Sequence, residues 1–124
     1  MNRTIRVQIE ANSYEVPFPN VGQLMDIESL KFGMTNNKYV DMYLSGMRQS
    51  MFIIDAVDAI STFSILIPDL KKDYVVKSID QLDPIKIKPL IKAYKTTYLP
   101  WYSEIMKQVL EEDEEIQKEE AEDI

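Results

Sequence analysis

The sequence predicts a mainly α-helical fold, in which an N-terminal β-hairpin packs on a small bundle of four to five helices. Apolar and polar residues alternate over residues 4–18, as in strands, and apolar residues recur at helical spacing over most of residues 20–110. Proline, glycine and asparagine fall between these segments, where turns and helix ends are expected. The 124 residues, 45% of them hydrophobic, suffice for one core, so we expect a single domain over residues 1–110.

The hairpin is predicted from two short alternating stretches, "TIRVQIE" (residues 4–10) and "YEVPF" (residues 14–18). The "ANS" between them (residues 11–13) has turn chemistry. Pro17 has no N–H to donate to a strand ladder, so it should lie at an edge or at a strand end. Because an isolated hairpin is marginally stable in water, this one should lie on helices or pair with another chain.

Two helices are expected next. Asn20 is a plausible N-cap for a helix through "VGQLMDIESLKF", which Gly33 should end. The "TNN" at residues 35–37 resembles another cap, so we expect a second helix from Lys38 to about Gly46.

The third and longest helix is predicted from about Arg48 to Ile67, and Pro68 stops it. Its apolar residues cover most of its circumference, as in the central helix of a bundle. Two aspartates interrupt the apolar run of residues 51–67, so we interpret it as a core helix and not as a membrane span. The N-terminal "MNRTIRVQIE" lacks the apolar segment of a signal peptide, and we expect a cytoplasmic protein.

The remaining segment carries mixed signals. Residues 69–82 predict a short helix and a loop, and Asp83–Pro84 resembles a strong helix start. Pro89 should kink that helix or delay its start, and Pro100 should kink the chain again or begin a final helix. Glutamate and lysine favour helix, so the final helix is able to continue past Glu111.

The negative charge of the chain is concentrated at one end. Residues 111–124 hold nine acidic residues and one lysine, a net charge of −8, whereas the whole chain carries −7. The first 110 residues are therefore nearly neutral, with no basic face that indicates nucleic-acid binding. The acidic segment is expected to be a solvated helix end or tail that keeps the protein soluble, and the alternative is a specific contact with a basic partner or Ca²⁺.

The composition argues against an enzyme. Histidine and cysteine are absent, which removes the usual general base, the standard triads and zinc sites. Three glycines cannot form a phosphate-binding loop. Asp55 and Asp58 lie three apart on the third helix and are a candidate acid–base or metal pair. We favour a polar stripe bonded to lysine or tyrosine, and we expect no cofactor and no bound metal.

Two groups of side chains indicate protein binding. Met42, Met47 and Met51 lie close together across the second and third helices, and methionine surfaces adapt to varied apolar partners. Ordinary core filling is an equally good explanation for them. The aromatic "YLPWY" (residues 98–102) offers interface anchors, although a plug in the core at a helix junction is the favoured interpretation.

The layout resembles that of a known family. An N-terminal hairpin, then "FPNVGQLMDIESLKFG", "DAISTFSILIPDL", "YLPWY" and a charged tail are similar to the tail assembly chaperones of long-tailed bacteriophages. The resemblance implies a small, soluble, mostly helical, non-enzymatic protein. It implies a partner, the long helical tape measure protein. Such chaperones coat this partner before the tail tube polymerises, and they are absent from the finished virion. In many phages a ribosomal frameshift near the gene's end yields a second, longer product.

The family offers no motif that assigns single residues, so the contact is a hypothesis from side-chain type. We expect it to be lined by Met42, Met47, Met51, Trp101 and Tyr102. Self-association is also compatible with these surfaces, and neither nucleic acid nor membrane is an expected partner. Three alternatives stay open: a structural virion protein of the neck, connector or tail, an acidic inhibitor of a host nucleic-acid enzyme, and a catalyst that uses Asp55 and Asp58.

Overall fold

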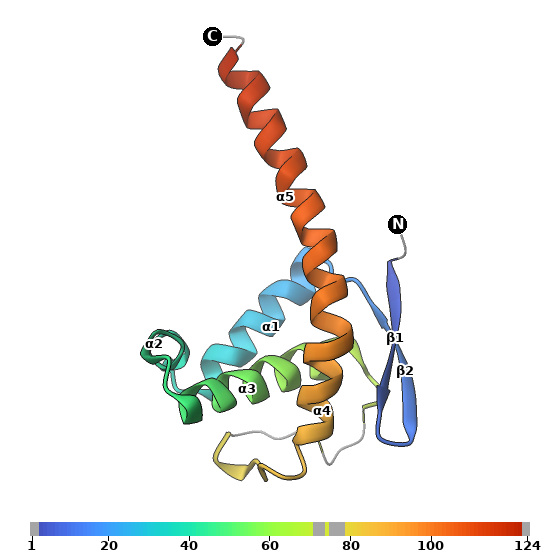
Figure 1. Ribbon diagram of the computed structural model, residues 1–124, viewed down its shortest axis with the longest axis vertical. Helices are drawn as coiled ribbons and strands as arrows, with labels where there is room; N and C mark the ends of the chain where they lie inside the picture. The colour runs from blue at the N-terminus through green and yellow to red at the C-terminus, as the bar shows by residue number, and fades with distance from the viewer. Residues whose placement is uncertain (1–2, 71–73, 75–78, 123–124) are drawn as a thin grey trace.

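The computed structural model describes residues 3–70, 74 and 79–122, and in this part of the chain the hairpin lies against one side of a group of helices (Figure 1). The last helical segments are continuous, so the described residues form four helical bodies, and the predicted fold class is confirmed. In chain order the elements are β1 (Thr4–Ile9), β2 (Asn12–Pro17), α1 (Val21–Met34), α2 (Tyr39–Ser45), α3 (Arg48–Leu66), a 3-10 turn (Ile79–Gln81), α4 (Lys88–Ala93), a π turn (Tyr94–Tyr98) and α5 (Leu99–Glu122).

The hairpin turns more tightly than the sequence predicted. Ile9 pairs with Asn12, so the turn consists of Glu10 and Ala11 alone. The assignment of Asn12 and Ser13 to the turn, and of Glu10 to the first strand, was therefore wrong. A two-residue loop matches the twist of the flanking strands when a residue takes a positive φ, and Glu10 does so at 54°. Pro17 is the last residue of β2, at the strand end where it was expected.

α1 begins with a capping box. The Asn20 side chain accepts a hydrogen bond from the Gln23 backbone N–H at 2.8 Å, and the Gln23 side chain accepts one from the Asn20 N–H at 3.0 Å. Two backbone donors that the helix itself leaves unpaired are thereby satisfied. The predicted cap at Asn20 is confirmed, and Gln23 adds the reciprocal bond.

The end of α1 differs from the prediction. The helix continues through Gly33 to Met34, so the glycine does not stop it. Asn36 and Asn37 follow with φ of 51° and 63°, the left-handed conformation that asparagine tolerates better than most residues. The "TNN" segment thus ends one helix and does not cap the next, and Lys38, at the N-cap of α2, makes no side-chain capping bond.

α3 matches its predicted bounds to within a residue and forms the centre of the fold, as Figure 1 shows. By length and composition alone, its 19 residues are long and apolar enough to cross a membrane. Half of that apolar window is buried inside the protein, against the neighbouring helices, as is usual for a core helix. The buried residues of α3 are Ile54, Ala56, Val57, Ala59, Ile60, Ser61, Thr62, Phe63 and Leu66.

α4, the π turn and α5 form one continuous rod that extends well beyond the hairpin and the other helices (Figure 1). Pro89 delays the start of the rod, since residues 84–87 form turns and α4 begins at Lys88. Pro100 has no N–H for the carbonyl four residues earlier, and the turn before it widens: the Leu99 N–H donates to the Tyr94 carbonyl, five residues back. The acidic residues 111–122 are helical. Much of the predicted helix and loop at residues 69–82 lies outside the described residues.

An aromatic cluster attaches this rod to the rest of the molecule. Tyr98 lies at its centre, 2% exposed, and contacts rings of α3, of the π turn and of the start of α5. Phe18, just after β2, joins the cluster through Trp101 and Tyr102. Adjacent ring centroids lie 5.4–5.9 Å apart, the range in which aromatic pairs attract one another. The aromatics of "YLPWY" therefore pack at a helix junction. We define the aromatic cluster as Phe18, Phe63, Tyr94, Tyr98, Trp101 and Tyr102.

Replacement of Asn20 tests the capping box. Asn20→Ala removes the acceptor for the Gln23 N–H and should lower the free energy of unfolding by about 1 kcal/mol. Asn20→Ser retains an oxygen acceptor and should be close to wild type. Urea denaturation of the three proteins measures this, and equal stabilities for the Ala and Ser variants would contradict the role of the cap.

Replacement of Phe63 tests the aromatic cluster. Phe63 is fully buried and contacts Tyr94 and Tyr98, so Phe63→Ala leaves a cavity and should cost about 3–5 kcal/mol. Tyr43→Ala is the control, because Tyr43 is 57% exposed and its loss should change stability by less than about 0.5 kcal/mol. Thermal and denaturant unfolding should separate the two variants clearly.

Candidate functional site

Asp58, one of the two candidate catalytic carboxylates, is held by two side chains from other elements. The Tyr39 hydroxyl of α2 donates a hydrogen bond to Asp58 Oδ1 at 2.6 Å. Lys31 Nζ of α1 lies 3.4 Å from the same oxygen, and it also pairs with Glu28 at 3.2 Å. The ammonium group lies 5.6 Å from the centre of the Tyr39 ring, within cation–π range. One carboxylate thus joins three helices.

Burial dominates the titration of this network. It raises the pKa of the Asp58 carboxyl above its usual value of 3.8, and the bonds from Tyr39 and Lys31 offset only part of the rise. Burial and the bond to Asp58 raise the pKa of the Tyr39 hydroxyl well above its ordinary value of 10.0. The tyrosine therefore keeps its proton at neutral pH and serves as a hydrogen-bond donor.

Asp55 has a partner of its own. Lys95 Nζ donates to Asp55 Oδ2 at 3.0 Å, and this ion pair bridges α3 to the π turn. The two carboxylates are thus bonded to a lysine and a tyrosine, which confirms the interpretation of a polar stripe. Among the described residues, no group of three acidic side chains is placed to hold a metal ion. The two aspartates of α3 thus connect it to α1, α2 and the π turn.

A more distinctive feature is the outer face of α2. This helix has no buried residue, and Val40, Tyr43 and Leu44 are 48%, 57% and 74% exposed. Their i, i+3, i+4 spacing places them on one helix face. Met47, 67% exposed, follows directly after the left-handed turn at Gly46. We call Val40, Tyr43, Leu44 and Met47 the α2 surface.

The inner side of α2 explains why its apolar face points outward. Tyr39 contacts the ring of Phe32 edge-on, with centroids 5.9 Å apart, and bonds to Asp58. Met42, three residues later on the same side, is half-buried. Since these residues face α1 and α3, the neighbouring face with Val40 and Leu44 is left to solvent, and Tyr43, one turn after Tyr39, lies at its border. Contiguous exposed apolar patches indicate interaction sites, whereas single scattered apolar residues do not.

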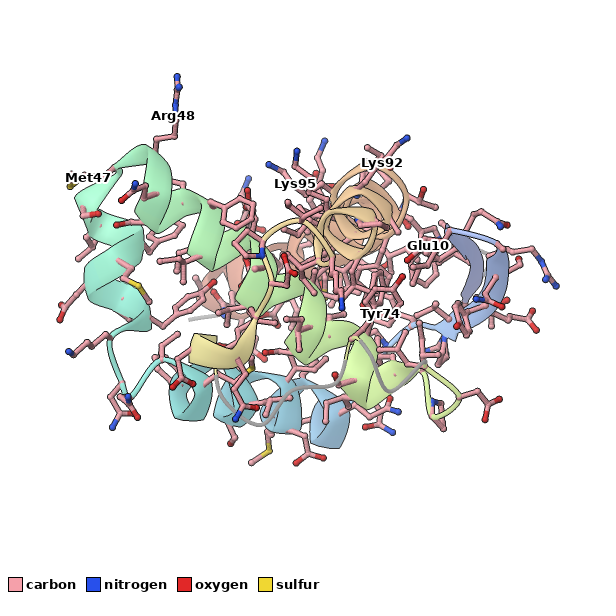
Figure 2. All side chains as sticks on the ribbon, turned by 90° about the horizontal axis from the view of Figure 1, so that it is seen from below. Glu10, Met47, Arg48, Tyr74, Lys92 and Lys95 are labelled. Carbon is pink, nitrogen blue, oxygen red and sulfur yellow. The ribbon has the colours of Figure 1, made fainter. Side chains whose placement is uncertain are left out.

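The structure does not bring the five predicted contact residues to one place. Met47 belongs to the α2 surface, whereas Met42 and Met51 are half-buried beside it. Trp101 and Tyr102 are half-buried at the start of α5, within the aromatic cluster. α2 and α5 lie apart in Figure 1, and in Figure 2 Met47 lies far from the end-on rod.

Sequence reasoning missed Val40, Tyr43 and Leu44. A signal was present, because "YVDMYLS" (residues 39–45) carries apolar or aromatic side chains on both faces of a short helix. A peripheral helix buries only one of these faces.

Comparison of the chain with protein-family models, curated proteins and solved structures finds no match. What the protein does must therefore be inferred from its own surfaces.

The raised pKa of Asp58 predicts a pH dependence of stability. The folded state holds the Asp58 proton more tightly than the unfolded chain does. The contribution of Asp58 to the free energy of unfolding is therefore complete below pH 3.8, and it is lost as the pH rises through the folded-state pKa. Asp58→Asn removes this titration and keeps an acceptor for Tyr39. Relative to the variant, wild type should become less stable from pH 3.8 towards neutral pH. Urea denaturation at a series of pH values measures the difference. A relative gain of wild-type stability over this range would contradict the prediction.

Proposed function

We propose that the protein is a non-enzymatic binding protein whose α2 surface covers an apolar stripe on a helical partner. The observation that carries the proposal is the exposure of Tyr43 and Leu44, on a helix with no buried residue, and of Met47 just after that helix, each more than half accessible. Apolar side chains at i, i+3 and i+4 are the pattern by which one helix packs against another.

The resemblance to phage tail assembly chaperones supports a narrower proposal. In it, the partner is a long helical tape measure protein, which the protein keeps soluble in the host cytoplasm before the tail tube assembles. A long amphipathic helix exposes its apolar stripe until the tube encloses it, and such a stripe favours aggregation. Many copies of a small protein would shield it.

The size of the α2 surface suits a contact that is later displaced. Full burial of one large apolar side chain contributes roughly 1.5–3 kcal/mol, and these four side chains are already partly buried. Association entropy opposes that gain. A single contact is then weak, and strength comes from repetition along the partner.

Co-expression tests this proposal. The longest helix-rich protein encoded beside this chain should be insoluble alone and soluble with it, and the two should co-purify. Tyr43→Ser, Leu44→Ser and Met47→Ser together should weaken the complex at least about tenfold, or about 1.4 kcal/mol, without loss of folding. Val21→Ser with Met25→Ser is the matched control, because both residues are more than half exposed on α1. Equal binding by both variants would exclude the α2 surface.

A structural virion subunit is the second candidate. Within the described residues β1 and β2 pair only with each other, so the outer edge of either strand can accept a strand from a neighbour. Purified particles distinguish the two functions. A chaperone should be absent from them, and recovery of the protein at fixed stoichiometry would instead favour the structural role.

A further inference from the structure

The charges of the chain are separated along the long axis of the molecule. Residues 111–122, the far end of α5, hold eight acidic residues and one lysine. The rod begins at the opposite end, where lysines occupy positions 86, 88, 92 and 95 (Figure 1). Figure 2 views that end and labels Lys92 and Lys95, of which Lys95 pairs with Asp55 of α3.

An open groove lies at the lysine-bearing end. It has a volume of about 910 Å³ and is walled by apolar side chains that include Phe52, Ile85 and Pro89. Lys88 and Lys92 are four residues apart on α4, on one helix face, and both line the groove. Glu10 is the single acid among the described residues that line it. We call this cavity the α4 groove; it offers apolar contact between positive charges.

The opposite end of the rod has the complementary chemistry. Val109 and Ile116 are 46% and 54% exposed, and they continue the face on which Ile105 is buried in the body of the protein. Acidic residues share this face: Asp113 lies four residues after Val109 and three before Ile116, and Glu112 and Glu120 lie beside them. We call Val109 and Ile116, with these flanking acids, the α5 stripe.

We propose that the α5 stripe of one copy of this protein docks in the α4 groove of a second copy. Apolar side chains of the stripe would pack on Phe52, Ile85 and Pro89, while its carboxylates meet Lys88 and Lys92. Residues 109–122 extend about 20 Å at 1.5 Å per residue, long enough for two to four turns to lie along the groove. The charge pattern selects this partner, because two α5 stripes would repel each other.

Repetition of this contact gives a closed ring if the rotation between copies closes and an open chain if it does not. The stripe and the groove lie at opposite ends of one rod, so a molecule cannot fill its own groove (Figure 1). A head-to-tail contact uses two different surfaces, and each added copy presents a new groove and a new stripe. The α2 surface takes no part and stays available to another protein. The association does not depend on the function proposed above.

Analytical ultracentrifugation of the full chain tests the proposal with two variants. Lys88→Glu with Lys92→Glu reverses the groove charges, and Val109→Ser with Ile116→Ser removes the stripe. All four residues are exposed, so both proteins should fold, which circular dichroism checks. Wild type should form oligomers whose fraction rises with concentration, and each variant alone should weaken association at least about tenfold, or about 1.4 kcal/mol. Arg3→Glu with Lys38→Glu changes the net charge equally outside the groove and should associate like wild type.

A mixture of the two variants gives the sharpest result. The groove variant keeps an intact stripe and the stripe variant keeps an intact groove, so together they should form a one-to-one dimer that grows no further. A wild-type protein that stays monomeric at every concentration would overturn the proposal. It would do so even if the α5 stripe bound a basic amphipathic peptide. A closed dimer that both variants retain would overturn it as well. The α2-surface variant should associate normally, which separates this result from failure of the proposed function.

Discussion

Attachment of the C-terminal rod through the aromatic cluster is the constraint on which the arrangement of the helices depends. Tyr98 packs against Phe63 of α3 on one side and stacks on Tyr102 of α5 on the other. Phe18, just after the hairpin, stacks on the same Tyr102 at 5.4 Å. Rings from three parts of the chain thus converge at one point, and buried aromatic pairs contribute more than their area alone. Beyond Ile105 and the half-buried Met106, α5 is exposed through residue 122.

The backbone of the π turn belongs to the same constraint. Pro100 removes a donor and pushes the preceding turn to a five-residue repeat, so the helix does not break where the proline interrupts its hydrogen bonds. The rod therefore stays continuous through the cluster and carries residues 111–122 away from the core. A break at Pro100 would have let the acidic segment fold back. Continuity produces the separation of charge between the two ends of the molecule.

Features set by neighbouring residues were predictable from the sequence. The strand alternation, the Asn20 cap, the bounds of α3 and the delay at Pro89 all follow from side-chain chemistry within a few residues of each feature. The errors occur where a local signal has two physical uses. Asparagine caps helix starts and also tolerates the left-handed conformation that ends them, and the chain uses Asn36 and Asn37 in the second way. Which face of α2 is buried depends on α1 and α3, which no local pattern contains.

The same dependence explains the polar residues that first resembled a catalytic pair. Asp58 sits on the central helix at a cost of desolvation, as its raised pKa indicates. The hydrogen bond from Tyr39 then fixes one side of α2 against α3. Because a short helix without buried residues has little else to orient it, that bond and the Phe32 contact decide which side faces outward. The carboxylate thereby sets the direction of Val40, Tyr43 and Leu44, the face that we propose to meet a partner. The position of Asp58 on α3 thus accounts both for the half-buried polar network and for the apolar residues that α2 exposes.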